Sequence, residues 1–428
     1  MPNAELVALA PLDSPPLIER VLGPFQRFFA TSAAGGLVLL ACTAVALAWA
    51  NSPWAAGYHH LWETPVTVGA PGFGLTLSLH AWVNDGLMAL FFLVVGLEIK
   101  RELTVGELQD RRTAALPAIA ALGGMVVPAL LFLAIAGDGA RRGWGAPMAT
   151  DIAFALGVVG LLGDRIPSAT RLFLLALAIV DDLGAIAVIA IFYTSGLDLA
   201  WLAGAVVAVA GVALLRGRWW ALLTLGPVAW WCTHESGIHA TIAGVALGLV
   251  IPVARGERYE HRLHPFTSYL VVPLFALANA GVRLTGTLGA PGAGRLAAAI
   301  VVGLVLGKVL GVAGATWLGV RLGLGVLPKG MNARQLLGVA ATAGIGFTVS
   351  LFVVDLAYPS APALAAGAKV GVLIASVTAA VLGAALLLRA GGPVPSALPG
   401  RSGPVPPPLR GRSGPGGTDE VPAPEPSN

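Results

Sequence analysis

The chain has 428 residues, of which 56% are hydrophobic and 11% are charged, and its mean hydropathy is +0.81. Soluble domains carry about 25% charged residues, so this composition excludes a soluble globular protein and indicates a polytopic membrane protein. The formal net charge of +4 is too small to indicate a nucleic-acid partner, and it is informative only through the positions of Lys and Arg. Cys42 and Cys232 both fall in apolar segments, where they read as small packing residues rather than as a disulfide.

Residues 1–32 precede the first apolar run and contain acidic residues and several prolines. This is unlike the basic start of a cleavable signal peptide, so we expect the first helix to stay in the mature protein. A transmembrane domain is predicted over 33–388, because about twelve apolar runs there approach the 17–25 residues that span a bilayer. The runs are 33–50, 81–99, 114–136, 144–163, 169–193, 198–215, 219–234, 237–254, 266–286, 296–318, 333–356 and 367–388.

Two segments of the chain do not read as spans. Residues 58–79 alternate in polarity and contain Pro-Gly, which predicts a small periplasmic hairpin. Residues 391–428 are rich in Pro, Gly and Ser and are expected to form a disordered cytoplasmic tail.

The distribution of Lys and Arg predicts the orientation. If the N-terminus is cytoplasmic, one set of loops holds most of the cationic residues, and the opposite set holds only Arg141, Arg142, Arg283, Arg295 and Lys369. Cytoplasmic loops carry the excess of positive charge, so both termini are expected to be cytoplasmic in a cell membrane protein.

Two of the predicted spans are interrupted at mid-depth. The string APMATDIAFALG interrupts 144–163, and TAGIGFTVS interrupts 333–356. Broken helices at membrane depth are tolerated where the exposed backbone faces protein or a wet cavity. Each break lies in the middle member of a three-helix set, 114–193 or 296–388, so the pattern predicts inverted three-helix repeats of a secondary transporter with two discontinuous helices. The predicted fold class is therefore an all-α polytopic membrane protein.

Ionisable residues inside these spans indicate where the chemistry lies. Asp181 and Asp182 have roughly eight to ten apolar residues on each side, and one aspartate at the bilayer centre costs about 2.5–3.5 kcal/mol. Asp151 follows Thr150 at the first break, and Lys308 lies inside another apolar run. Carboxylate, hydroxyl and carbonyl oxygens are the ligands of hard cations, so the set predicts a site for a cation or for protons.

A structural explanation remains open for this set, namely a buried salt-bridge cluster that only fixes helix packing. The coincidence of three acids and one lysine with two helix breaks favours the functional explanation. Asp85 lies close to a helix end, where a capping or surface role is as plausible as a functional one.

A second polar cluster is predicted on the cytoplasmic side. Its members are Glu98, Arg101 and Glu102, which share one helix face, together with Glu260, His261 and His264. His239 falls on the other side of the membrane by this topology. Histidine near carboxylates is suited to a switch near neutral pH, and the alternative is a solvated, salt-bridged rim.

Enzymatic interpretations are poorly supported. The string HESGIH resembles a zinc motif, but its histidines are five residues apart and do not share a helix face. Intramembrane aspartyl proteolysis needs aspartates on different helices, one of them in a Gly-x-Gly-Asp string that the chain lacks. No phosphate-cradling motif indicates a nucleotide, so we expect neither enzyme activity nor a cofactor.

Seven strings together resemble the NhaA-type sodium/proton antiporters. They run in order from about residue 25 to 390: FFLVVGLEIKREL, PMATDIAFALG, LALAIVDDLGAI, GIHATIAGV, VVPLFALANAGV, LVLGKVLGV and GIGFTVSLF. The resemblance implies that Asp151 and Asp182 form the Na⁺ or Li⁺ site, that Asp181 pairs with Lys308, and that Thr150 lies where the broken helices cross.

The resemblance also implies properties beyond the ion site. It implies a pH-responsive role for the cytoplasmic cluster and for His239, and electrogenic exchange of cytoplasmic Na⁺ or Li⁺ for external protons. It further implies a homodimer in membrane lipid, joined partly by the 58–79 hairpin. The competing function classes are a passive cation channel, which would not move protons uphill, and a solute symporter, which would need an organic-substrate pocket.

Overall fold

Helices make up most of the structure, a computed structural model that describes residues 34–69, 74–106, 108–109, 111–194, 196–328 and 330–390. These residues belong to one unit. The predicted N-terminal segment 1–32 and the predicted tail 391–428 lie outside the described residues.

The described residues of the first half of the chain contain eight α-helices, one π-helix and two 3₁₀ segments. In chain order they are α2 (Ala34–Ala50), α3 (Ala55–Glu63), α4 (Leu79–Ala81), the π-helix η1 (Trp82–Leu87), α5 (Met88–Thr104), α6 (Arg111–Ile135), η2 (Asp138–Met148), α7 (Ile152–Leu161), η3 (Gly163–Arg165), α8 (Ser168–Phe192) and α9 (Leu199–Leu214).

The second half continues the helical pattern, again with short π and 3₁₀ segments. It contains α10 (Trp219–Glu235), α11 (Thr241–Val250), α12 (Val253–Phe266), η4 (Thr267–Val271), α13 (Val272–Asn279), η5 (Thr287–Gly289), α14 (Ala293–Val301), η6 (Val302–Gly307), α15 (Lys308–Arg321), α16 (Ala333–Thr342), α17 (Phe347–Ala357) and α18 (Pro362–Ala390).

Membrane-spanning length is met by five helices among the described residues, or by up to eight if each bent pair is one span. The five are Leu79–Thr104, Thr113–Ile135, Ser168–Phe192, Ala293–Arg321 and Pro362–Ala390. Other predicted spans are helical but shorter than the roughly 20 residues that cross a bilayer upright, such as α9 and α11. The count of twelve therefore stays a prediction, whereas the all-α membrane class is supported.

Both interrupted spans are broken helices in the structure. η2 and α7 meet at 51°, and α16 and α17 meet at 44°. A third bend of 114° separates α2 from α3, and the hydropathy pattern did not reveal it. Two features accompany this bend: Pro53 cannot donate a backbone hydrogen bond, and the Asn51 side-chain amide donates both to the carbonyl of Leu47 in α2 and to the carbonyl of the distant Val282, each at 2.8 Å.

The β-hairpin is shorter than the predicted range 58–79. Strands β1 (Pro65–Val68) and β2 (Leu75–Ser78) pair antiparallel with Pro65 opposite Ser78. Residues up to Glu63 instead belong to α3, because Tyr58 and Trp62 are four residues apart and are buried on one helix face. Strand pairing starts only at Pro65, and all four residues of β1 are exposed.

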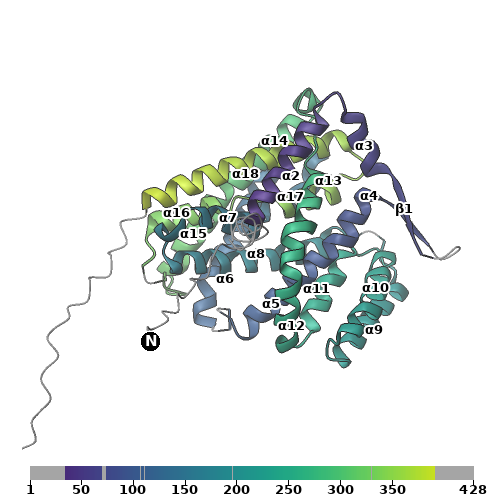
Figure 1. The fold of residues 1–428 in the computed structure, drawn as a ribbon. Helices are drawn as coiled ribbons and strands as arrows, with labels where there is room; N and C mark the ends of the chain where they lie inside the picture. The colour runs from purple at the N-terminus through teal and green to yellow at the C-terminus, as the bar shows by residue number, and fades with distance from the viewer. Residues whose placement is uncertain are drawn as a thin grey trace, which may run out of the picture. The chain divides into compact units, whose positions relative to one another are not determined.

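Small residues let the central helices approach closely. A methyl group at Gly123 of α6 would lie 2.3 Å from the carbonyl oxygen of Gly311 of α15, and one at Gly311 would lie 2.1 Å from that of Gly123. Glycine is therefore required on both sides of this crossing. Figure 1 shows α9 and α10 side by side at one edge of the bundle, away from α7, α8 and α16.

Candidate functional site

The two breaks cross each other, and Asp151 lies at the crossing. Asp151 is the N-cap of α7, and its Oδ1 accepts a hydrogen bond from the backbone of Phe154 at 3.0 Å. Its Oδ2 accepts from the backbone and hydroxyl of Thr348 at 3.1 and 2.7 Å. An aspartate at an N-cap satisfies backbone donors that the helix start leaves open. Both breaks therefore aim their donors at one carboxylate.

Backbone contacts hold the crossing together. The Asp151 amide donates to the carbonyl of Ile345 at 2.6 Å, and the Thr150 hydroxyl donates to that of Ala343 at 2.7 Å. A methyl group at Gly346 would lie 2.2 Å from the Ser350 hydroxyl oxygen and 2.9 Å from the carbonyl of Ala149. Gly346 is required because no side chain fits between the two chain segments that cross here.

Four helix ends meet at this point. η2 ends at Met148 and α16 at Thr342, whereas α7 begins at Ile152 and α17 at Phe347. The C-terminal ends carry partial negative charge and favour a cation, and the N-terminal ends favour a carboxylate. The crossing is therefore polar although it is buried inside an apolar bundle.

Lys308 lies against the crossing and pairs with Asp181. Its ammonium donates to Asp181 Oδ1 and Oδ2 at 3.0 and 2.8 Å, and to the Thr150 hydroxyl at 3.0 Å. Both charged side chains are 0% exposed. A buried charge is tolerable only when it is paired and hydrogen-bonded, and here each of the two ions supplies the other's partner.

Asp182 has a different environment from its neighbour. It is buried, and its Oδ1 has no hydrogen-bond partner among the described residues. It lies within Coulombic range of Asp151, Lys308 and Glu98. Successive residues of a helix point about 100° apart, and it is Asp181 that accepts both hydrogen bonds from Lys308. An unpartnered buried carboxylate oxygen is suited to a proton or a cation.

The predicted cytoplasmic cluster is only partly assembled. The Arg101 guanidinium donates to Glu260, and to Glu102 Oε1 at 3.1 and 3.3 Å. Burial raises the pKa of Glu260, and the Arg101 charge opposes that rise. His264 lies within Coulombic range of Glu260. Glu98 lies within Coulombic range of Asp182. No structural contact ties His261 to this group among the described residues.

His239 contacts groups other than those of this cluster. Its Nε2 is 3.3 Å from Asp85 Oδ1, and its Nδ1 is 2.9 Å from the Thr241 hydroxyl. The edge of its ring packs on Phe352, with 4.8 Å between ring centroids. Asp85 is therefore a partner of His239 rather than a simple helix cap.

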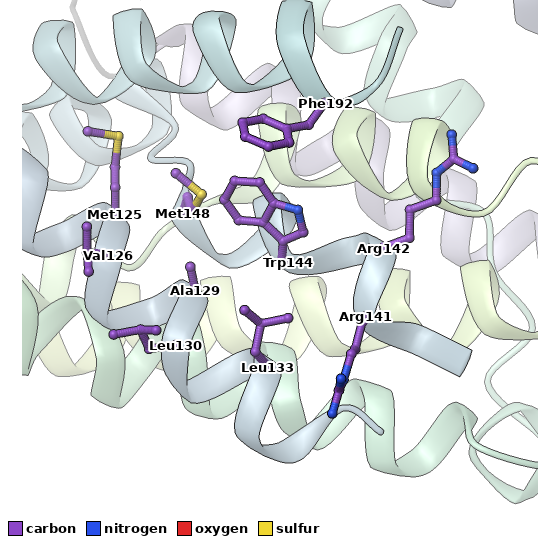
Figure 2. Close-up of a pocket in the computed structure, with 10 residues that line it drawn as sticks. All are labelled: Met125, Val126, Ala129, Leu130, Leu133, Arg141, Arg142, Trp144, Met148 and Phe192. Carbon is purple, nitrogen blue, oxygen red and sulfur yellow. The ribbon is translucent and has the colours of Figure 1, made fainter. Parts of the chain in front are cut away.

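A cavity of about 620 Å³ opens between α6, η2 and the end of α8 (Figure 2). Trp144 and Phe192 form one wall, and among the described residues its lining is apolar apart from Arg141 and Arg142. Such a lining repels a cation, so this cavity is not the ion site. The described residues also contain no group of three or more His, Cys, Asp or Glu that could hold a metal ion.

Thr348 is the site residue that the sequence pattern did not single out. It donates two hydrogen bonds to Asp151 and is 2% exposed. Its signal was present in the string GIGFTVS, because a hydroxyl residue directly after a helix break can reach the facing helix end. Only the crossing shows that its partner is Asp151.

Comparisons with known proteins agree with the geometry. The family model described as Na+/H+ antiporter 1 matches residues 26–387. The Na(+)/H(+) antiporter NhaA of Acidovorax sp. (strain JS42) is 52% identical over 387 residues, which cover 86% of this chain and 93% of that protein. NhaA 2 of Myxococcus xanthus (strain DK1622) is 45% identical, over 88% and 92% of the two chains.

A third relative is NhaA of Escherichia coli O139:H28, which is 46% identical over 84% of this chain and 96% of its own length. These relatives are transporters and not enzymes, and the resemblance drawn from the motifs is confirmed. The chain is a multi-pass inner-membrane protein and belongs to the Na+/H+ antiporter 1 family.

Proposed function

We propose that this protein is a secondary antiporter that exports Na⁺, or Li⁺, in exchange for external protons. The observation that carries the proposal is the unequal pair at the crossing. Lys308 neutralises Asp181, whereas Asp182 keeps an oxygen without a partner and lies within Coulombic range of Asp151. Membership of the sodium/proton antiporter family supports this assignment.

Asp151 and Asp182 are the proposed ligands, completed by the oxygen of Thr150. Two carboxylates at one site hold either protons or a cation, because the protons and the cation compete for the same carboxylate oxygens. Sodium arriving from the cytoplasm displaces the protons, and external protons displace sodium after the site reorients. Two protons exchanged for one monovalent cation make the cycle electrogenic. The proton gradient drives it, so no nucleotide or other cofactor is required.

Reorientation is proposed to follow the inverted-repeat plan of about twelve helices. In this plan the broken helices of 114–193 and 296–388 cross at the site, and one bundle moves relative to the rest. The contacts between α6 and α15 and the two bends support it. Both termini are proposed to be cytoplasmic, in keeping with the positions of Lys and Arg.

The cytoplasmic cluster is proposed to regulate transport by pH. Glu98 connects it to the ion site, because Asp182 lies within Coulombic range of that carboxylate. Glu260 and Glu102 share the charge of Arg101, so protonation of one changes the pairing of the other. His261, His264 and His239 are proposed to contribute through their charge.

A homodimer in membrane lipid is the proposed assembly. The hairpin of β1 and β2 is exposed, and Val68 is 55% exposed. A two-stranded hairpin is marginally stable alone, so pairing with a second copy would stabilise it.

The deciding experiment follows the proton gradient across everted membrane vesicles by a fluorescent pH probe. Adding NaCl or LiCl should collapse a preformed gradient, and KCl should act as the comparison cation. A passive channel would conduct Na⁺ without moving protons uphill, and a symporter would need an organic solute. Vesicles whose gradient is unchanged by both NaCl and LiCl would contradict the proposed function.

A further inference from the structure

A second set of polar side chains lies away from the ion site, and transport as described above does not use it. Two of its members, Asn84 and Asn279, are buried, and the other three are partly buried. It joins five elements: α4, η1, α13, α17 and α18. We call it the outer polar cluster and define it as His80, Asn84, Asn279, Asp355 and Lys369. Buried polar and charged groups in a membrane bundle are costly, so such a cluster calls for a function.

The cluster is built around one ion pair. Lys369 Nζ lies 2.7 Å from Asp355 Oδ1, and the two side chains are only 12% and 19% exposed. Asn84 donates to the other oxygen, Asp355 Oδ2, at 3.3 Å, and His80 Nε2 is 3.8 Å from it. The two carboxylate oxygens therefore receive their partners from different helices.

Asn279 closes the ring of contacts. Its side-chain amide donates to Asn84 Oδ1 at 2.8 Å, and its Oδ1 accepts from Lys369 at 3.4 Å. The same oxygen is 3.0 Å from His80 Nε2. Asn279 is 1% exposed, so its hydrogen bonds are made inside the protein and not with solvent.

α17 places this cluster in line with the ion site. Thr348, which binds Asp151, and Asp355 are seven residues apart, so they lie on one helix face about 10 Å apart. Phe352 lies between them, is 1% exposed, and packs against Phe92 and Phe275 with centroids 5.7 and 6.3 Å apart. Packed phenylalanine side chains thus separate the ion site from the outer polar cluster along α17.

From this alignment we infer that the outer polar cluster is the mouth through which cations and protons reach the ion site from outside, with Phe352 as the barrier between them. The inference rests on the proposed antiport and its topology, which put Lys369 on the external side. A carboxylate at the mouth concentrates cations, and the Lys369 ammonium limits that effect. The balance of these two charges sets the affinity seen from outside.

The test measures Na⁺ half-saturation from each face, in right-side-out and everted vesicles of a host without other sodium/proton antiporters. Asp355→Asn leaves Lys369 unpaired and positive, so the external half-saturation should rise about tenfold, the lower end of what focused charge contributes in a cleft. Lys369→Gln leaves Asp355 unpaired, so the same quantity should fall. The double variant should return near the original value, with the cytoplasmic half-saturation unchanged in all three.

Opposite shifts of the external half-saturation in the two single variants distinguish an electrostatic effect at the mouth from a structural clasp, that is, an ion pair that only holds the helices together. Both single variants break the same ion pair, so a clasp predicts shifts in the same direction from both faces, and that result would overturn the inference. Asp138→Asn is the control, because it removes an equal charge from a pair with Arg141 whose acid is 92% exposed. If the Asp355→Asn protein fails to accumulate, Lys369→Gln and the double variant still show the direction in which the external half-saturation shifts.

The barrier is tested separately. Phe352→Ala should let protons leak across vesicles without Na⁺, whereas Phe132→Ala, which empties an equally buried position of α6, should stay proton-tight. A Phe352→Ala protein as tight as this control would overturn the barrier.

The inference and the proposed function can fail separately. If the unmodified protein moves protons on addition of NaCl but the charge variants leave the external half-saturation unchanged, the inference about the mouth is wrong and the proposed antiport stands. If the unmodified protein shows no exchange, both the proposed antiport and the inference about the mouth are wrong.

Discussion

At the scale of single residues, burial without a partner distinguishes the neighbours Asp181 and Asp182. Asp181 is satisfied by the Lys308 ammonium, whereas Asp182 Oδ1 has no hydrogen-bond partner among the described residues. An ion site needs ligands that are free to exchange their proton, and only the second aspartate meets this condition. The two carboxylates are therefore expected to respond differently to the same substitution.

We expect Asp182→Asn to abolish exchange, because an amide neither releases a proton nor neutralises a cation. Asp181→Asn should keep part of it, because its amide oxygen can still accept from Lys308. Dequenching of the pH probe on addition of NaCl to everted vesicles measures both. Full exchange by Asp182→Asn would contradict the assignment.

Thr348 supports the other proposed ligand. Thr348→Val removes the hydroxyl that donates to Asp151 at 2.7 Å but keeps the backbone donor at 3.1 Å. A hydrogen bond to a charged group contributes about 1.5–3 kcal/mol, so the half-saturation for Na⁺ should rise about tenfold or more. Thr348→Ser is the matched control and should stay near the original value. Equal values for Val and Ser would show that the hydroxyl is dispensable.

At the scale of elements, the crossing of the two broken helices depends on backbone proximity. Across the breaks the Asp151 amide donates to the carbonyl of Ile345, and the Thr150 hydroxyl donates to that of Ala343, so little room is left for further side-chain volume. This geometry accounts for glycine at position 346, where the nearest carbonyl would lie 2.9 Å from an added methyl group.

Gly346→Ala should therefore destabilise the protein by about 1–3 kcal/mol, the usual cost of overpacking. Its thermal unfolding midpoint in detergent should fall, and exchange should weaken with it. Gly314→Ala is the control, because that position of α15 has no atom within 4 Å of an added methyl group and helix propensity favours Ala. Equal unfolding midpoints for the two variants would contradict the close approach.

At the scale of the whole molecule, charge is distributed over three polar regions: the cytoplasmic cluster, the ion site and the outer polar cluster. Burial raises the pKa of Glu260, so folding favours its neutral form. The stability that this group contributes is present below its unfolded pKa and declines as pH rises through the raised folded pKa. Its ionisation on the alkaline side strengthens the pair with Arg101.

Glu260→Gln holds this position in the neutral, low-pH form. If that form is the less active one, the pH profile of exchange should move to alkaline pH by about one unit, which corresponds to about 1.4 kcal/mol. Glu257→Gln, an exposed position of the same helix, should leave the profile in place. Overlapping profiles for all three proteins would exclude Glu260 from regulation.

Assembly is the second property of the whole molecule. Replacing residues 65–78 with a short Gly-Ser linker should convert the proposed dimer to a monomer, because it removes the strands that are proposed to pair with the second copy. Light scattering on the detergent-solubilised protein measures the mass. Thr67→Ala, which removes only a hydroxyl contact of 2.8 Å to Thr76, should leave the mass unchanged. A deletion variant that keeps the mass of the unmodified protein would place the interface elsewhere.

Hydropathy and charge alone determined the membrane class and the two broken spans, and they singled out the aspartates and the lysine that we propose for the site. These signals are local: a buried charge or a polar break inside an apolar run violates the physics of the bilayer wherever the helix packs. The boundaries of most helices could be predicted for the same reason. The bend after Ala50 could not, because the contact that accompanies it joins Asn51 to the distant Val282.

Only the tertiary structure decided how the charged groups are partnered. Asp181 and Asp182 are adjacent in sequence, and which of them meets Lys308 depends on how α8 is rotated against α15. The partners of Thr348, Asp355 and Lys369 are likewise set by contacts between different segments of the chain: Thr348 donates to Asp151, and Asp355 pairs with Lys369. A sequence shows that a charge is buried, whereas its partner depends on helix packing over distances that no local pattern encodes.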